Sequence, residues 1–211
     1  MKKELILASG SPRRHEILTL AGIPHRVLVP PAGSADESAV EETPDDPGTY
    51  VRRLAQMKNR AALCAFGGRE EFRSAAFLTA DTVVWLPGRG GSPGEILGKP
   101  KDKEDAARML RDLSGREHYV LTGVMISDPE TGRETVFSEE TEVRFRELRE
   151  DEIQKYAASG DPFDKAGAYG YQSGACIFVE SIKGDYFNVV GLPVCRVSVE
   201  LYKLFADERP Q

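Results

Sequence analysis

The hydrophobic pattern of the chain changes repeatedly between short strand-like segments and stripes with helical spacing. Continuous apolar runs or alternating apolar and polar residues predict strands at residues 5–8, 26–29, 76–86, 117–127, 135–146 and 175–183. Apolar residues three to four positions apart predict helices at residues 12–21, 50–62, 102–113, 151–158 and 193–205.

Segments rich in Pro, Gly, Ser and acidic residues separate these elements. Residues 30–47 are expected to form a long surface loop, residues 69–74 an exposed connection and residues 87–94 the tip of a hairpin. The turn at residues 128–132 predicts an antiparallel hairpin that extends the sheet into a second lobe. Since no internal repeat interrupts the chain, we expect a single domain over residues 1–211, formed as two lobes.

Composition and charge restrict the class of partner. The chain has 211 residues, of which 40% are hydrophobic and 29% charged, which is typical of an ordinary globular protein. With 28 Lys and Arg against 34 Asp and Glu, the net charge is -6. That balance argues against a nucleic-acid or anionic-membrane partner, because those surfaces attract broad positive fields. A phosphate ligand would therefore need a local cluster of cations.

Cysteine usage and hydropathy indicate the compartment. Cys64, Cys176 and Cys195 are odd in number and lack metal-site or paired spacing, so neither a disulfide framework nor a zinc site is expected. No signal-peptide segment precedes the first strand, and no apolar run reaches the length of a membrane span. These features predict a cytoplasmic protein.

A strand, a tight polar turn and a helix start follow one another near the N-terminus. Pro12 suits the first helical turn, because that position needs no N–H donor. The hydroxyls of Ser9 and Ser11 lie beside the free N–H groups of this helix start. Arg13 and Arg14 add two guanidinium groups, which predicts a phosphate-binding site. In the alternative interpretation, Ser11 is only a helix cap and the arginines are solvated.

An acidic residue interrupts the apolar strand at residues 76–86. Burying Asp81 is costly unless its carboxylate is paired, protonated or bound to a cation. We therefore interpret Asp81 as a site residue; the alternative is a structural partner of the backbone or of one arginine. Lys58 and Lys99 are candidate phosphate ligands, although Lys58 at the edge of an apolar helix face can also simply extend into solvent. Lys99 precedes a proline and is therefore held in extended backbone.

The segment 159–172 is dense in glycine and charge. It is expected to bury little and to shape its backbone around a ligand. Asp164 and Lys165 supply an acid and a cation, while Tyr169 and Gln172 can stack on and hydrogen-bond to a nucleotide base. The alternative is an ordinary polar turn in which Asp164 and Lys165 form a weak surface pair.

Four motifs occur in an order that resembles the Maf family of nucleotide pyrophosphatases. They are Ser-Gly-Ser-Pro-Arg-Arg from Ser9, Ala-Asp-Thr-Val-Val from Ala80, Asp-Lys-Ala-Gly-Ala-Tyr-Gly-Tyr-Gln from Asp164 and Asn-Val-Val-Gly-Leu-Pro from Asn188. The resemblance implies hydrolysis of a nucleoside triphosphate to monophosphate and pyrophosphate with Mg²⁺ or Mn²⁺, by a cytoplasmic homodimer. It also implies an α/β fold with an elongated mixed β-sheet bent around a central cleft and flanked by helices, similar to inosine-triphosphate pyrophosphatases.

The same resemblance implies roles for matched residues. Asp81 matches the catalytic acid, and Arg13, Thr82 and Gln172 match the residues associated with the branch that hydrolyses dTTP and UTP. Six further residues fall at phosphate-binding positions, namely Ser9, Ser11, Arg14, Lys58, Lys99 and Lys165. The expected metal ligands are Asp81 together with Glu37 or Asp164.

One alternative function comes from a different class. A nucleotide-binding regulatory module, linked to cell-division arrest and without catalysis, would also need a phosphate site. A buried carboxylate beside a polyanion favours the enzyme, because a metal-dependent hydrolase needs Asp81 and a pure phosphate binder does not. The scattered histidines His15, His25 and His118 argue against a Ser/His/Asp hydrolase.

Overall fold

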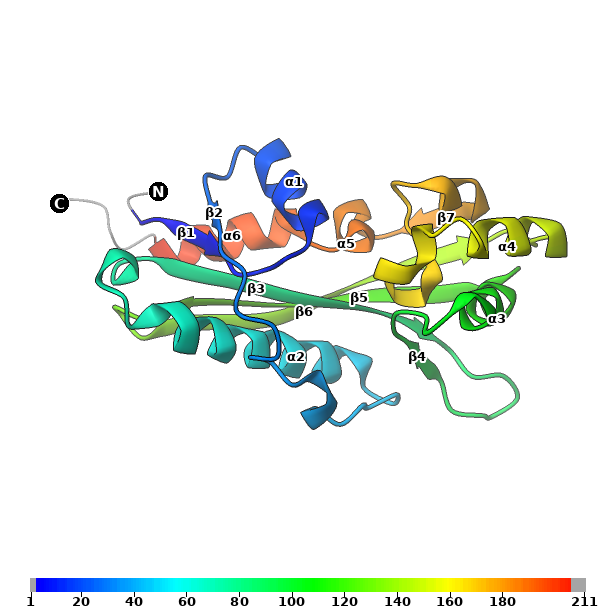
Figure 1. Cartoon of the computed structure of the whole chain (residues 1–211), viewed down its shortest axis with the longest axis horizontal. Helices are drawn as coiled ribbons and strands as arrows, with labels where there is room; N and C mark the ends of the chain where they lie inside the picture. The colour runs from blue at the N-terminus through cyan, green and yellow to red at the C-terminus, as the bar shows by residue number, and fades with distance from the viewer. Residues whose placement is uncertain (1–2, 206–211) are drawn as a thin grey trace.

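A computed structural model describes residues 3–205 and arranges them as one long mixed sheet with helices on both faces (Figure 1). The strands are β1 (Leu5–Leu7), β2 (Arg26–Val27), β3 (Ala76–Leu86), β4 (Glu95–Leu97), β5 (Glu117–Asp128), β6 (Arg133–Phe145) and β7 (Val179–Lys183). The helices are α1 (Pro12–Leu20), α2 (Pro47–Ala62), α3 (Lys103–Leu113), α4 (Glu150–Ala157), α5 (Tyr186–Val190) and α6 (Val194–Phe205). None of the helices in this part of the chain has the length and apolar character needed to cross a membrane. The α/β class is confirmed.

Strand β3 has one edge that is only partly paired. The sheet order is β2-β1-β3-β5-β6-β7, with β4 also on β3. Strand β5 occupies one edge of β3 along residues 77–85, so β1 and β4 share the opposite edge. Strand β1 pairs in parallel with residues 76–78, and β4 pairs antiparallel with residues 84–86. On that opposite edge, none of the described strands pairs with the intervening residues 79–83, and we call this stretch the unpaired edge of β3.

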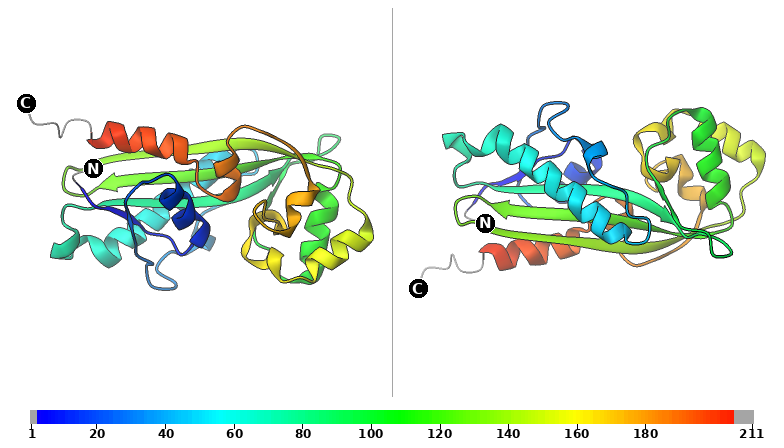
Figure 2. Two further views of the ribbon diagram at one scale, coloured as in Figure 1. Left: turned by 90° about the horizontal axis from the view of Figure 1, so that it is seen from above. Right: turned by 90° about the horizontal axis from the view of Figure 1, so that it is seen from below.

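Helices divide the molecule into two lobes on a shared sheet. In the first lobe, α2 covers one face and α1, α5 and α6 cover the other (Figures 1 and 2). The second lobe, at the far end, contains β4, α3, α4 and the short turns of residues 161–178. Strands β5 and β6 run through both lobes and pair along their whole length. The predicted extension of the sheet by this hairpin is confirmed.

Two local predictions are wrong, and one short helix was not predicted. Residues 174–178 form a 3₁₀ turn, so the strand predicted from residue 175 starts only at Val179. The short helix α5 was not predicted, because it has too few residues for a helical pattern to be visible. The connection at residues 69–74 is not wholly exposed, because Phe72 is buried. Its ring packs edge-on against Phe66 and lies under the guanidinium of Arg26. A single buried aromatic in a charged segment gives no periodic signal.

Candidate active site

Segments far apart in the sequence meet at the unpaired edge of β3. Because side chains alternate along a strand, Asp81 and Thr82 point to opposite faces of the sheet. Asp81 contacts Lys58 of α2, whereas Thr82 contacts Arg14 of α1 and the backbone of Gly191 after α5. The unpaired edge of β3 thus has the Asp81 carboxylate on one face of the sheet and the Thr82 hydroxyl on the other.

Lys58 links two predicted acidic site residues. Its Nζ contacts Asp81 Oδ1 and lies 2.8 Å from Glu37 Oε1, in a 3₁₀ turn of the loop before α2. Burial alone would lower the pKa of Lys58, but the two carboxylates outweigh that effect and raise it. The structure therefore brings Glu37 and Asp81 to one cation, even though Glu37 lies in a segment with no hydrophobic pattern.

Arg14 is buried and almost fully hydrogen-bonded. Its Nε donates to Gly191 O at 2.9 Å, and NH1 donates to Ala80 O at 2.8 Å and Ser9 Oγ at 3.1 Å. NH2 donates to Thr82 Oγ1 at 3.1 Å. Four of the five guanidinium N–H groups are therefore engaged within the protein. Burial lowers the pKa of Arg14, against the attraction of Asp81.

The start of α1 keeps its backbone donors available. Ser11 occupies the cap position, but its side chain makes no capping hydrogen bond, and Pro12 follows at the first helical position. The backbone N–H of Ser11 donates instead to Ser9 Oγ at 3.3 Å. The first turn contains no acidic residue. The interpretation of Ser11 as a simple helix cap is therefore not supported, and the free N–H groups suit an anion.

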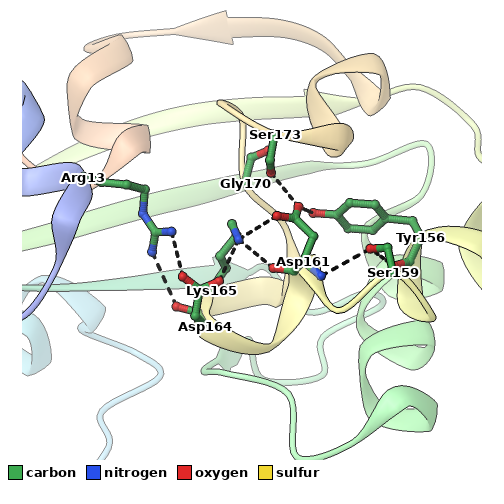
Figure 3. Close-up of polar contacts among 8 residues, drawn as sticks. All are labelled: Arg13, Tyr156, Ser159, Asp161, Asp164, Lys165, Gly170 and Ser173. Atoms are coloured by element: carbon green, nitrogen blue, oxygen red, sulfur yellow. Dashed lines mark hydrogen bonds and ion pairs between the residues drawn. The ribbon is translucent and has the colours of Figure 1, made fainter.

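Arg13 reaches from α1 to the second lobe (Figure 3). Its NH1 lies 2.9 Å from Asp164 Oδ2, and its NH2 donates to Asp164 O at 3.4 Å. Lys165 contacts the other oxygen, Asp164 Oδ1, at 2.6 Å. Burial would raise the pKa of Asp164, but the bonds from Lys165 and Arg13 lower it below its ordinary value. Arg13, a cation from the first lobe, thus joins the predicted pair of Asp164 and Lys165.

Tyr169 does not face a ligand. It is 5% exposed, and its hydroxyl lies 2.8 Å from Nε2 of the buried His118. Its ring packs against Phe145 with centroids 4.8 Å apart. The expectations that Tyr169 stacks on a base and that residues 159–172 bury little are both wrong, because one face of this segment completes the core of the second lobe.

Gln172 and Lys99 are exposed in segments that lie close together. Gln172 belongs to the turn after Tyr171, and Lys99 follows Gly98, whose carbonyl accepts a hydrogen bond from Gly167 N at 3.0 Å. Gly167 has φ +66, and an added Cβ would lie 2.8 Å from Val84 Cγ2. Glycine is therefore needed where the 161–173 segment crosses β3.

Several polar residues at the site were not predicted. Thr122 Oγ1 lies 2.9 Å from Thr82 Oγ1, and the buried Asn188 donates to Val120 O at 3.0 Å and Thr141 Oγ1 at 3.0 Å. Thr122 lies in an alternating strand where a threonine is unremarkable, so the sequence gives no signal. Asn188 begins a recognised motif, but its role in joining α5 to the sheet requires the tertiary contacts.

The predicted metal ligands do not form one group. Among residues 3–205, no set of three His, Cys, Asp or Glu side chains is arranged to hold a metal ion. Glu37 and Asp81 share Lys58, whereas Asp164 contacts Arg13 and Lys165.

A surface hollow lies elsewhere. It has a volume of about 430 Å³ and is lined by Pro31, Ser34, Met57, Arg60, Ala61, Cys64 and Ala65. No predicted site residue lines it, so the candidate site is identified by converging polar groups.

Comparison with known proteins shows the family of the chain. The chain matches the family model of Maf-like proteins over residues 4–204. The chain belongs to the Maf-like protein family. A dTTP/UTP pyrophosphatase of Geotalea uraniireducens is 45% identical over 208 residues, covering 98% of both chains. A Geobacter protein with the same name is 48% identical over 193 residues, covering 92% of this chain and 91% of the relative. A Geobacillus protein with that name is 46% identical, covering 96% and 98%.

Proposed function

We propose that this Maf-like chain hydrolyses dTTP and UTP to the nucleoside monophosphate and pyrophosphate. The observation that carries the proposal is the position of Asp81 at the unpaired edge of β3, where it contacts Lys58 and is followed by Thr82, which accepts a hydrogen bond from Arg14 of α1. The names of relatives at 45% to 48% identity support this substrate class.

The chain's own residues can neutralise and orient a triphosphate. Four proposed cations, Arg13, Arg14, Lys58 and Lys99, compensate its charge locally in a protein of net charge -6. Ser9, Ser11 and the amides of α1 are proposed to bind phosphate oxygens. Lys165 was also predicted to bind phosphate, but its three N–H groups contact protein oxygens in this structure.

The reaction requires a water proton to be accepted while one phosphoanhydride bond breaks. A water oxygen attacks the α-phosphorus, and the bond from that phosphorus to the bridging oxygen breaks, so that pyrophosphate leaves with the electron pair. Asp81 is proposed to accept the water proton as the new P–O bond forms. Lys58 is already in contact with Asp81 and can hold its carboxylate in place before the reaction.

The carboxylates fit a hard divalent cation. Glu37 Oε1 and Asp81 Oδ1 both contact the Lys58 ammonium, so these two hard oxygen ligands already share one cation. Mg²⁺ sites commonly use one or two carboxylates together with substrate phosphates. We propose Asp81 and Glu37 as the ligands of Mg²⁺ or Mn²⁺, because Asp164, the third predicted ligand, contacts Arg13 and Lys165 instead. When bound, the ion would withdraw charge from the phosphate oxygens.

Base selection is assigned to a separate set of residues. We propose that Gln172 meets the donor and acceptor edge of uracil or thymine, because its amide offers both functions. Arg13 and Thr82 complete the proposed specificity set. The Thr82 hydroxyl already lies between Arg14 and Thr122, so it joins base selection to the phosphate site.

The test separates catalysis from binding. UTP, dTTP, CTP and GTP are incubated with the wild type and with Asp81→Asn in Mg²⁺ or Mn²⁺, and nucleoside monophosphate and pyrophosphate are quantified by chromatography. We expect Asp81→Asn to lower kcat by at least about 10³-fold, as loss of a proton acceptor and of metal binding would combine. A non-hydrolysable UTP analogue should still bind.

A matched control is Glu140→Gln, which removes an exposed acid of the same sheet and should retain activity. Orthophosphate as the product, or undiminished hydrolysis by Asp81→Asn, would contradict the proposal. Binding without hydrolysis by the wild type would instead favour the regulatory module. We also propose a cytoplasmic homodimer, to be tested by fractionation and by light scattering.

A further inference from the structure

The ammonium group of Lys165 has all of its donors occupied. Its Nζ lies 2.6 Å from Asp161 O, 3.0 Å from Asp161 Oδ1 and 2.6 Å from Asp164 Oδ1. An ammonium group has three N–H donors, so none is left for a substrate oxygen in this arrangement. The side chain is only 11% exposed, and an added Cβ at Gly170 would lie 2.5 Å from its Cε. Lys165 is therefore enclosed by its own loop.

Asp161 accepts the hydrogen bonds that hold the segment of residues 161–173 in place. Its Oδ1 accepts from Lys165, and its Oδ2 accepts from the Ser173 hydroxyl at 2.5 Å and from the Tyr156 hydroxyl (Figure 3). Burial would raise the pKa of Asp161, but these hydrogen bonds outweigh it and lower the pKa. The carboxylate thus joins the end of α4 to both ends of the 161–173 segment. Tyr156, Asp161 and Ser173 have no role in the proposed chemistry.

The same chain of contacts ends at Arg13. Asp164 gives one carboxylate oxygen to Lys165 and the other to Arg13. An isolated surface ion pair orders its partners weakly, and the Asp164 side chain is 60% exposed. Here, however, Lys165 is held by Asp161, so the Asp164 carboxylate is fixed on the side away from Arg13. The order of contacts is Asp161, Lys165, Asp164 and Arg13.

We propose that Asp161 is a positioning residue that orients the Arg13 guanidinium through Lys165 and Asp164. The inference rests on the proposed function for the identity of the ligand, a pyrimidine nucleoside triphosphate. It assigns Lys165 to orientation rather than to phosphate binding, and Asp164 to Arg13 rather than to a metal. A guanidinium that is oriented before the substrate arrives loses less conformational entropy on binding.

A double-mutant cycle tests this assignment. Asp161→Asn keeps the shape of the side chain but removes the charge that holds Lys165. It is compared with the wild type, Arg13→Ala and the double variant. The readouts are kcat/KM for UTP and the Kd of α,β-methylene-UTP. Asp151→Asn is the matched control, because it removes an exposed acid of α4 that pairs only with Arg149 among the described residues.

We expect Asp161→Asn to weaken analogue binding about tenfold, the size of one charge-assisted hydrogen bond. In the Arg13→Ala background the same change should have less than about a twofold effect, because residues that act as a unit are not additive. Mg²⁺ titration of activity should give the same midpoint with and without the Asp161 change. Asp151→Asn should match the wild type.

Three results separate the possible failures. Equal effects of Asp161→Asn in both backgrounds, or a shifted Mg²⁺ midpoint, would overturn the positioning role. If Asp161→Asn does not fold, Ser173→Ala, which removes one donor to Asp161, is taken through the same cycle on Kd. If the wild type binds the analogue but releases no monophosphate, the proposed function is overturned, while the double-mutant cycle can still be measured on the Kd of the analogue. If the wild type neither binds the analogue nor releases monophosphate, both the proposed function and the positioning role are overturned.

Discussion

Arg14 and Lys165 are cations of recognised motifs, yet their hydrogen-bond partners give them different capacities for a ligand. Arg14 has one uncommitted N–H group, and Lys165 has none. Lys58 contacts Asp81 and Glu37, and Arg13 uses two N–H groups on Asp164, so each of these cations keeps at least one N–H group for a ligand. At the scale of single residues, burial and the number of unoccupied N–H groups therefore decide which arginine or lysine of the motifs can bind a ligand.

The burial of His118 predicts that the stability of the fold depends on pH. The ring is fully buried, and burial lowers the pKa of His118 from 6.5 to about 3. Between these two values the unfolded chain binds a proton at this position and the folded chain does not. Stability from this residue is therefore present above pH 6.5 and is lost as pH falls toward 3, by up to about 1.4 kcal/mol per pH unit.

We expect His118→Gln to reduce the slope of unfolding free energy against pH between pH 6.5 and 4. Urea unfolding at several pH values measures this slope, which does not depend on the absolute stability of the variant. His15→Gln, at an exposed position, is the control. An unchanged slope in His118→Gln would show that the buried ring does not determine this acid sensitivity.

Helix α2 positions Lys58 because it lies directly on the sheet. At Gly123 of β5, an added Cβ would lie 2.1 Å from Val51 O and 2.8 Å from Arg52 N. Both neighbours are backbone atoms of α2, so a side chain could be accommodated only if the helix moved away. At the scale of elements, one glycine thus sets the distance between the helix with Lys58 and the strands next to Asp81.

Gly123→Ala is expected to destabilise the fold by about 2–3 kcal/mol, because overpacking against backbone cannot be relieved by a rotamer change. It should also weaken Mg²⁺-dependent activity by moving Lys58 relative to Asp81. Urea unfolding and UTP kinetics measure the two effects. Gly68→Ala, where the added Cβ meets nothing within 4 Å, should leave both unchanged. Wild-type stability in Gly123→Ala would exclude this close approach.

The two lobes share their central strands. The second-lobe core contains Val120 and Val143, and the first-lobe core contains Val124 and Phe137 from the same two strands. Contacts of Arg13 and Arg14 further join α1 to the second lobe and to β3. At the scale of the whole molecule, neither lobe has a sheet of its own, so we expect one cooperative folding unit.

Urea unfolding tests this expectation with two probes. The fluorescence of Trp85, the single tryptophan of the chain, reports on β3 where it meets β4, and far-UV circular dichroism reports on the whole backbone. Coincident midpoints and slopes are expected for one two-state unit. A Trp85 transition at a lower urea concentration would indicate that the second lobe unfolds independently.

The sequence alone determined the features that depend on local pattern. Strand β3, helix α3 and the β5–β6 hairpin follow from side-chain periodicity and turn residues, and the start of α1 follows from Pro12. Asp81 was recognisable because a carboxylate is out of place in an apolar strand. The motifs were sufficient to indicate the family.

Only the tertiary structure decided which side chains meet. It placed Tyr169 in the core, because one face of the 161–173 segment covers the second lobe. It also joined Glu37 to Lys58, and Asp161 to Arg13 through Lys165 and Asp164. These contacts link residues up to 151 positions apart, so they depend on how strands and helices pack. Local propensity carries no information about such long-range neighbours.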